Sequence, residues 1–160
     1  LRWQKSRLVM MTEILSTLLP PGMAKPTSKT KLESSLWREM REAIRRSSRD
    51  IDATRIETYA TPGLPDVVLC DERGRFHFVE LKAARSNAVS LRPHQIAWLT
   101  RHRRASVWVL IRKTSVLDQL YLYPGSAAVE LRAKGLAGVL PHFYCEGRID
   151  WNAVLNAVCN

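Results

Sequence analysis

The sequence predicts an α/β (α+β) domain in which helices flank a central mixed β-sheet. Two observations lead to this prediction. An amphipathic helical pattern precedes a β-hairpin pattern, and a second helix separates that hairpin from two further apolar, β-rich runs. Strands that alternate with helices form a sheet whose faces the helices can cover.

The first helix is expected at residues 31–47. Apolar side chains recur there at every fourth position, which places them on one face: Leu32, Leu36, Met40 and Ile44. Arginines fill much of the remaining surface, so the outer face of this helix is basic. After a polar connection, a strand is expected at residues 54–59.

A hairpin follows. The turn-forming residues 61–65 deliver the chain into a strand at 67–70, and a polar cluster at 71–74 reverses it into a second strand at 76–82. Ser90 and Pro93 open another helix, which should run to about residue 103. Two strands are expected at 107–111 and 120–123, and a short helix at 126–134. Asp150 is a suitable N-cap for a last helix at 151–158.

The length and composition describe one globular domain. A chain of 160 residues can bury a single core, so residues 29–160 are assigned to one domain and residues 1–28 to an N-terminal extension outside it. No apolar run approaches the roughly 18 residues that a membrane span needs, which argues against an integral membrane protein. No small-molecule cofactor is expected.

Charge and cysteine usage indicate a partner class and a compartment. The 25 Lys and Arg against 15 Asp and Glu give a net charge of +10, which favours nucleic acid as the partner, although basic surfaces also serve solubility alone.

Cys70, Cys145 and Cys159 form no CxxC pair and are expected to be reduced, mostly buried thiols in a cytoplasmic compartment.

Chemistry-bearing residues concentrate in the hairpin. Side chains alternate along a strand, so Glu80 and Lys82 point to the same side of the sheet. If the turn is centred on Arg73, antiparallel pairing places Asp66 opposite Glu80. Two carboxylates beside one ammonium suit a hard divalent cation such as Mg²⁺. The alternative, a turn cap and an exposed ion pair, is disfavoured because the strand around the charges is apolar.

These residues carry a resemblance. The run Gly63-Leu64-Pro65-Asp66, then Phe78-Val79-Glu80-Leu81-Lys82, then Gln95 on the next helix resembles the PD-(D/E)XK nuclease superfamily. It is most similar to the branch with VRR-NUC domains and the phage and archaeal Holliday junction resolvases, and the similarity covers roughly residues 32–111. The resemblance implies a restriction-endonuclease-like core and a Mg²⁺-dependent deoxyribonuclease, with Mn²⁺ able to substitute.

The resemblance also implies roles for individual residues. Asp66, Glu80 and the carbonyl of Leu81 would hold the metal, Lys82 would be the catalytic lysine, and Gln95 would point back to the site. A glutamate on the first helix completes the metal site in many family members. Glu33 is the candidate for that position, and its competitors are Glu39, Glu42 and Glu57.

The expected substrate is DNA, cut in a structure-selective manner at branched sites by a homodimer in a bacterial or phage-infected cell. Phosphate contacts are assigned to basic residues of the two helices: Arg41, Arg45, Arg101, Arg103 and Arg104. The alternatives are a sequence-specific homing or restriction-type endonuclease of the same fold, or a non-catalytic nucleic-acid-binding module.

Histidines and tryptophans are given no catalytic role. His77 and His94 flank the site in sequence but have no partner at metal-ligand spacing. The tryptophans within apolar runs are expected in the core and not as base-stacking platforms: Trp37, Trp98, Trp108 and Trp151.

Overall fold

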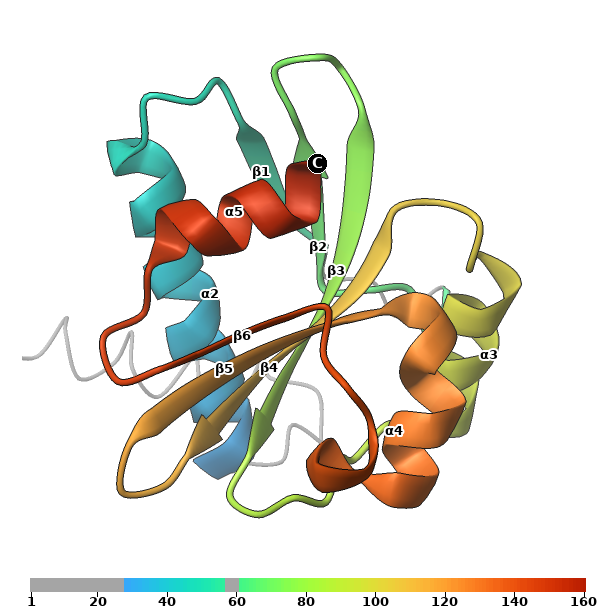
Figure 1. Ribbon diagram of the computed structural model, residues 1–160. Helices are drawn as coiled ribbons and strands as arrows, with labels where there is room; N and C mark the ends of the chain where they lie inside the picture. Colours follow the sequence, from blue (N-terminus) through green and yellow to red (C-terminus); the bar gives the residue numbers. More distant parts are fainter. Residues whose placement is uncertain (1–27, 57–60) are drawn as a thin grey trace, which may run out of the picture.

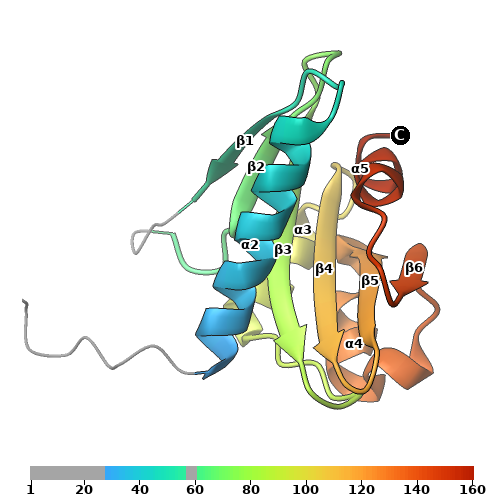
Figure 2. The same cartoon turned by 90° about the vertical axis from the view of Figure 1, so that its left-hand side faces the viewer.

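The computed structural model describes residues 28–56 and 61–160. They form a six-stranded mixed sheet with helices α2 and α5 on one face and α3 and α4 on the other (Figures 1 and 2). The predicted fold class, a mixed sheet flanked by helices, is therefore confirmed.

The strands lie in the sheet in their sequence order. They are β1 (Asp52–Arg55), β2 (Val67–Cys70), β3 (Phe76–Ala84), β4 (Val107–Thr114), β5 (Asp118–Pro124) and β6 (Phe143–Glu146). Only β3 and β4 pair in parallel, and every other neighbouring pair is antiparallel. A parallel pair needs a crossover connection, which here contains α3 (Pro93–Arg101).

The other helices are α2 (Ser28–Arg46), α4 (Ala128–Lys134) and α5 (Trp151–Cys159), and short 3₁₀ turns lie at Gly125–Ala127 and Leu136–Gly138. The expected helices are all present, with ends shifted by a few residues. Asp150 caps α5 as expected, since its carboxylate accepts a hydrogen bond of 3.1 Å from the backbone N–H of Ala153.

Two strand predictions differ from the structure. The first strand was expected at 54–59 but lies at Asp52–Arg55, and residues 57–60 are outside the described part. Strand β6 was not predicted at all. It is only four residues long, and its burial alternates between half-buried and exposed. Pairing with β5 makes it a strand, and this long-range pairing leaves little trace in so short a run.

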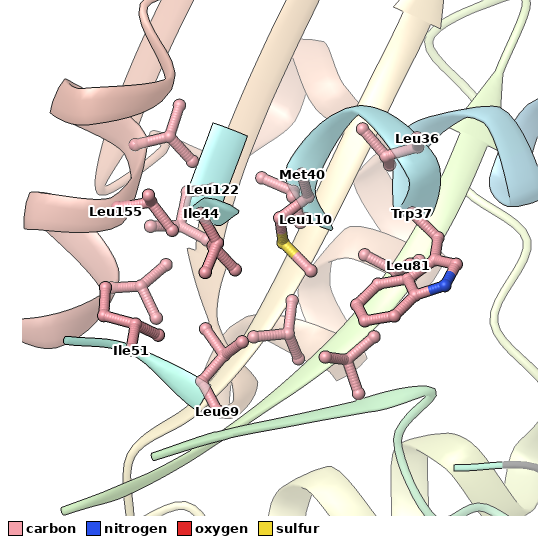
Figure 3. Close-up of a cluster of buried hydrophobic side chains, with 14 of the residues drawn as sticks. Leu36, Trp37, Met40, Ile44, Ile51, Leu69, Leu81, Leu110, Leu122 and Leu155 are labelled. Atoms are coloured by element: carbon pink, nitrogen blue, oxygen red, sulfur yellow. The ribbon is translucent and has the colours of Figure 1, made fainter. Parts of the chain in front are cut away.

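The larger core cluster lies between the sheet and helices α2 and α5 (Figure 3). Leu36, Met40 and Ile44 form the buried stripe that the four-residue spacing predicted, and Leu32 at its start is half-buried. A second cluster packs α3 and α4 against the opposite face through residues such as Leu99 and Leu131. Side chains of neighbouring β3 residues therefore enter different environments on the two faces.

The tryptophan and cysteine predictions hold only in part. Trp37 is buried in the core, whereas Trp98, Trp108 and Trp151 are half-buried and pack at its margins. The three cysteines are free thiols as expected, but only Cys159 is buried. Within residues 28–56 and 61–160, no helix combines the length and apolar character needed to cross a bilayer.

Candidate active site

The β2–β3 hairpin sets the positions of the acidic residues. Val67 pairs with Val79, and continuing this register by one residue places Asp66 opposite Glu80, as the turn centred on Arg73 predicted. The Asp66 carboxylate accepts a 2.9 Å hydrogen bond from the backbone N–H of Leu81. This contact fixes the Asp66 side chain against β3.

The site lies where strand β3 extends beyond the start of its neighbour β2. Strand β2 pairs only with Phe76–Val79 of β3, so in the described part of the chain the second half of β3 continues beyond the start of β2. The N–H and C=O groups of one strand residue point to the same side. Because the Leu81 N–H reaches Asp66, the Leu81 carbonyl also faces this edge.

Glu80 and Lys82 project together from the face of β3 that α3 covers. Glu80 is 0% exposed and Lys82 is 8% exposed, so the alternative of an exposed surface ion pair is wrong. The Lys82 ammonium lies 2.6 Å from Oε1 of Glu80, and the Gln95 side-chain amide donates to the same oxygen. The other oxygen, Oε2, is buried and has no hydrogen-bond partner among the described residues.

Gln95 is held in place by the start of α3. Its side-chain oxygen accepts a 3.0 Å hydrogen bond from the backbone N–H of Arg92, three residues earlier, while its amide group reaches Glu80. Arg92 was not among the predicted site residues, although a glutamine three residues after a helix N-cap has the spacing of a capping box. The helix start thus orients the amide toward the carboxylate.

Gly63 brings the turn before Asp66 against the same helix. Its φ of +88° is unfavourable for other residues, and a Cβ at this position would lie 2.2 Å from the backbone oxygen of His94. The close approach of this turn to α3 therefore requires glycine.

The charges in the site are unbalanced. Burial raises the pKa of Glu80 to about 7; Lys82 opposes this rise, and the nearby Asp66 carboxylate adds to it. Burial alone would lower the pKa of Lys82, but the adjacent Glu80 carboxylate outweighs this, so the pKa is raised. The ammonium therefore stays charged, while the positive charge near Glu80 only partly offsets the effect of burial on its carboxyl group.

Among the candidate glutamates on the first helix, Glu33 is the one whose charge raises the pKa of both Glu80 and Lys82, so it acts on the site electrostatically. The competitors lie elsewhere. Glu39 pairs with Arg112, Glu42 pairs with arginines of its own helix, and Glu57 is outside the described residues.

The side chains of the site could hold a hard cation only together with backbone, water or substrate oxygens. Across residues 28–56 and 61–160, no group of three or more Asp, Glu, His or Cys side chains is arranged to hold a metal by itself. Oxygen donors are nevertheless present around Glu80. They are its buried, unpartnered Oε2, the nearby Asp66 carboxylate and the carbonyl of Leu81, which follows Glu80 in β3. Mg²⁺ commonly takes one or two carboxylates and fills its remaining positions with water and substrate oxygens.

The remaining sequence candidates lie on the surface or on the other face of the sheet. The arginines proposed for phosphate contacts are all exposed, and Arg45 pairs with Glu42 at 2.9 Å. His94 is exposed. His77 is buried on the opposite face of β3 from Glu80, where its ring contacts Asp71 at 3.1 Å and Ser106 at 2.6 Å.

Comparisons with known proteins give a likeness among solved structures. No family model and no curated protein matches this chain. Among solved structures, the chain is similar to Hjc, a Holliday junction resolvase from the archaeal hyperthermophile Archaeoglobus fulgidus. The alignment has 20% identity and a TM-score of 0.41, and covers 59% of this chain and 74% of that one. The assignment of the site therefore rests on its own residues.

Proposed function

We propose that this protein is a metal-dependent endonuclease that hydrolyses phosphodiester bonds of DNA, with its active site at Asp66, Glu80 and Lys82. The observation that carries the proposal is the buried Glu80 carboxylate. One of its oxygens is bound by Lys82 and Gln95, and the other is buried with no hydrogen-bond partner in the described structure. Burying such a group is costly unless a ligand completes it.

A divalent cation would complete the site. Asp66, Glu80 and the Leu81 carbonyl would hold it, with Glu33 as a further candidate, and Mg²⁺ is the preferred ion because all these donors are hard oxygens. Bound there, the ion would act as a Lewis acid on the scissile phosphate and favour ionisation of the attacking water.

The protein groups have distinct tasks in this proposal. Lys82 holds a positive charge next to the reacting phosphate, where it can orient the attacking water and stabilise the negative charge that develops on the phosphoryl oxygens. Gln95 is a positioning residue, because it fixes Oε1 of Glu80, and Oε2 would then be available to hold the cation. Water adds across the P–O bond, and the products are a phosphate monoester and an alcohol.

The substrate is proposed to be branched DNA, bound by a homodimer. One domain offers one such site and cuts one strand, so a coordinated cut of two strands needs two copies related by a two-fold axis. Exposed arginines such as Arg41 and Arg103 recognise backbone charge and shape more than base sequence. A sequence-specific endonuclease of the same fold remains the competing hypothesis, and a non-catalytic DNA-binding module is the other.

Cleavage of a labelled four-way junction and of a linear duplex of equal length tests the proposal, with Mg²⁺ or with excess chelator. Asp66→Asn should abolish cleavage, and Lys82→Ala should reduce it about 100-fold or more even at saturating Mg²⁺. Asp52→Asn removes an exposed carboxylate of β1 and serves as the matched control. Full activity in chelator, or wild-type activity of Asp66→Asn, would overturn the assignment.

A further inference from the structure

Two aromatic side chains, Phe76 and Phe78, lie on the same face of β3 as the Glu80 carboxylate. Phe76, Phe78 and Glu80 alternate with residues of the opposite face, so all three project on the α3 side of the sheet. A strand rises about 3.3 Å per residue, which puts Phe78 about 7 Å and Phe76 about 13 Å from Glu80 along the strand.

Helix α3 supplies a second row beside the first. Gln95, Trp98 and His102 recur every three or four residues and lie on one side of the helix. Gln95 contacts Glu80, and the Trp98 ring lies 5.5 Å from the ring of Phe78. The His102 ring stacks on Trp98 with its centroid at 4.0 Å. The two rows thus run together, away from the active site.

We call the four rings of Phe76, Phe78, Trp98 and His102 the aromatic track. Its members are accessible to a ligand: Phe76 is 62% exposed, and the other three are half-buried. Single exposed apolar residues are common on proteins. This group differs because three of its rings, those of Phe78, Trp98 and His102, contact one another in series beside the buried carboxylate. Phe76 lies two residues before Phe78 on the same face of β3.

The surroundings of the aromatic track are basic. Arg101, Arg103 and Arg104 are exposed where α3 ends, beside His102. No acidic residue occurs in the sequence between Glu80 and Asp118, a stretch that carries eight Lys and Arg residues. Strand pairing puts three acids on this face: Glu80, Asp66 opposite it, and Asp52, whose β1 position pairs with Cys70. This distribution complements a polyanion.

We propose that the aromatic track binds an unpaired stretch of nucleic acid strand next to the bond to be cut. Bases would stack on Phe76 and Trp98 while the arginines contact the phosphates, the combination that single-strand-binding sites use. A fully paired duplex cannot use the rings in this way, because its bases are already stacked on one another. The inference rests on the proposed function for the position of the scissile bond, and it adds unpaired nucleotides beside that bond as a feature that the protein recognises.

The test compares a labelled duplex that carries a single-stranded tail with a fully paired duplex of the same length. Their affinities are measured by fluorescence anisotropy at one salt concentration in EDTA, so that no cleavage occurs. The wild-type protein should bind the tailed duplex more tightly. Phe76→Ala should reduce the ratio of the two affinities at least about fivefold, the lower end of the effect of losing one base–aromatic stack.

Two further variants separate stacking from other effects. Tyr144→Ala removes an aromatic ring that is 41% exposed on β6, at the other edge of the sheet, and should leave the ratio unchanged. Trp98→Leu should lower the ratio and remove part of the quenching of tryptophan fluorescence that a bound oligo(dT) causes. Thermal unfolding of each variant checks that the fold is retained.

Each outcome has one meaning for the aromatic track. A wild-type ratio in both Phe76→Ala and Trp98→Leu would overturn the inference. So would a change in molecular mass on Phe76→Ala with an unchanged ratio, since this would make the aromatic track a contact between copies of the chain. Selective binding of the tailed duplex without cleavage in Mg²⁺ would reject the proposed function and keep the inference. DNA cleavage in Mg²⁺ together with a wild-type affinity ratio in the aromatic variants would keep the proposed function and reject the inference.

Discussion

Replacing Glu80 by glutamine should inactivate the protein and at the same time stabilise its metal-free form. The substitution keeps the size of the side chain and leaves the Lys82 and Gln95 contacts near the same atoms, but it removes a buried negative charge. Activity and stability should therefore change in opposite directions, as expected where function requires an otherwise unfavourable group.

The magnitude follows from the pKa of Glu80. A rise from 4.5 in the unfolded chain to about 7 in the folded protein corresponds to about 3 kcal/mol of unfolding free energy, since one pKa unit is worth about 1.4 kcal/mol. This figure already includes the attraction to Lys82, which is among the causes of the pKa. For a chain of this size it amounts to a Tm difference of roughly 6 to 12 °C.

The sign of the pH dependence is fixed by the direction of the pKa. An acid whose pKa is raised on folding contributes most to stability below its unfolded value of 4.5, and this contribution is lost as the pH rises through about 7. The advantage of Glu80→Gln over the wild type should therefore be small at pH 4, grow between pH 4.5 and 7, and level off above pH 7.

Thermal unfolding of both proteins in EDTA across this pH range measures the difference directly. Glu130→Gln is the control, because Glu130 is 59% exposed and pairs only loosely with Lys134, at 3.6 Å; its effect should stay within about 0.5 kcal/mol. Adding Mg²⁺ at pH 8 should raise the Tm of the wild type more than that of Glu80→Gln. The reasoning would be refuted if Glu80→Gln were less stable than the wild type at pH 8. It would also be refuted if the Tm difference between the two proteins were the same at every pH.

Three further predictions concern the parts that position the site. Gly63→Ala should lower stability more than Gly74→Ala in denaturant unfolding. Both glycines have positive φ, but only a Cβ at Gly63 would meet the His94 backbone. Equal losses of stability in the two variants would contradict this prediction. Asp150→Ala should cost about 1 kcal/mol through the lost cap of α5, seen as a lower urea midpoint. The pKa of Asp71 is lowered, because backbone, His77 and Arg75 hydrogen bonds together outweigh its burial, so its contribution to stability is lost as the pH falls below 3.8. The stability of Asp71→Asn should therefore fall less than that of the wild type over this range, as measured by urea unfolding at each pH.

The sequence by itself determined the elements whose physical basis is local. The four-residue spacing of Leu36, Met40 and Ile44 predicts one face of α2, and two apolar runs joined by a polar turn predict the β2–β3 hairpin. Because a hairpin register follows from its turn, the placement of Asp66 opposite Glu80 also followed from the sequence.

Only the tertiary structure decided features that depend on distant parts of the chain. Strand β6 exists because β5 offers it an edge, and Glu33 is distinguished from Glu39 by which way α2 lies across the sheet. The raised pKa of Glu80 and the exposure of Phe76 depend on what covers each position, so identical strand periodicity leaves one residue buried and the other in solvent. Periodicity assigns a side chain to a face, but the packing of helices over that face sets its solvation, and solvation determines its chemistry.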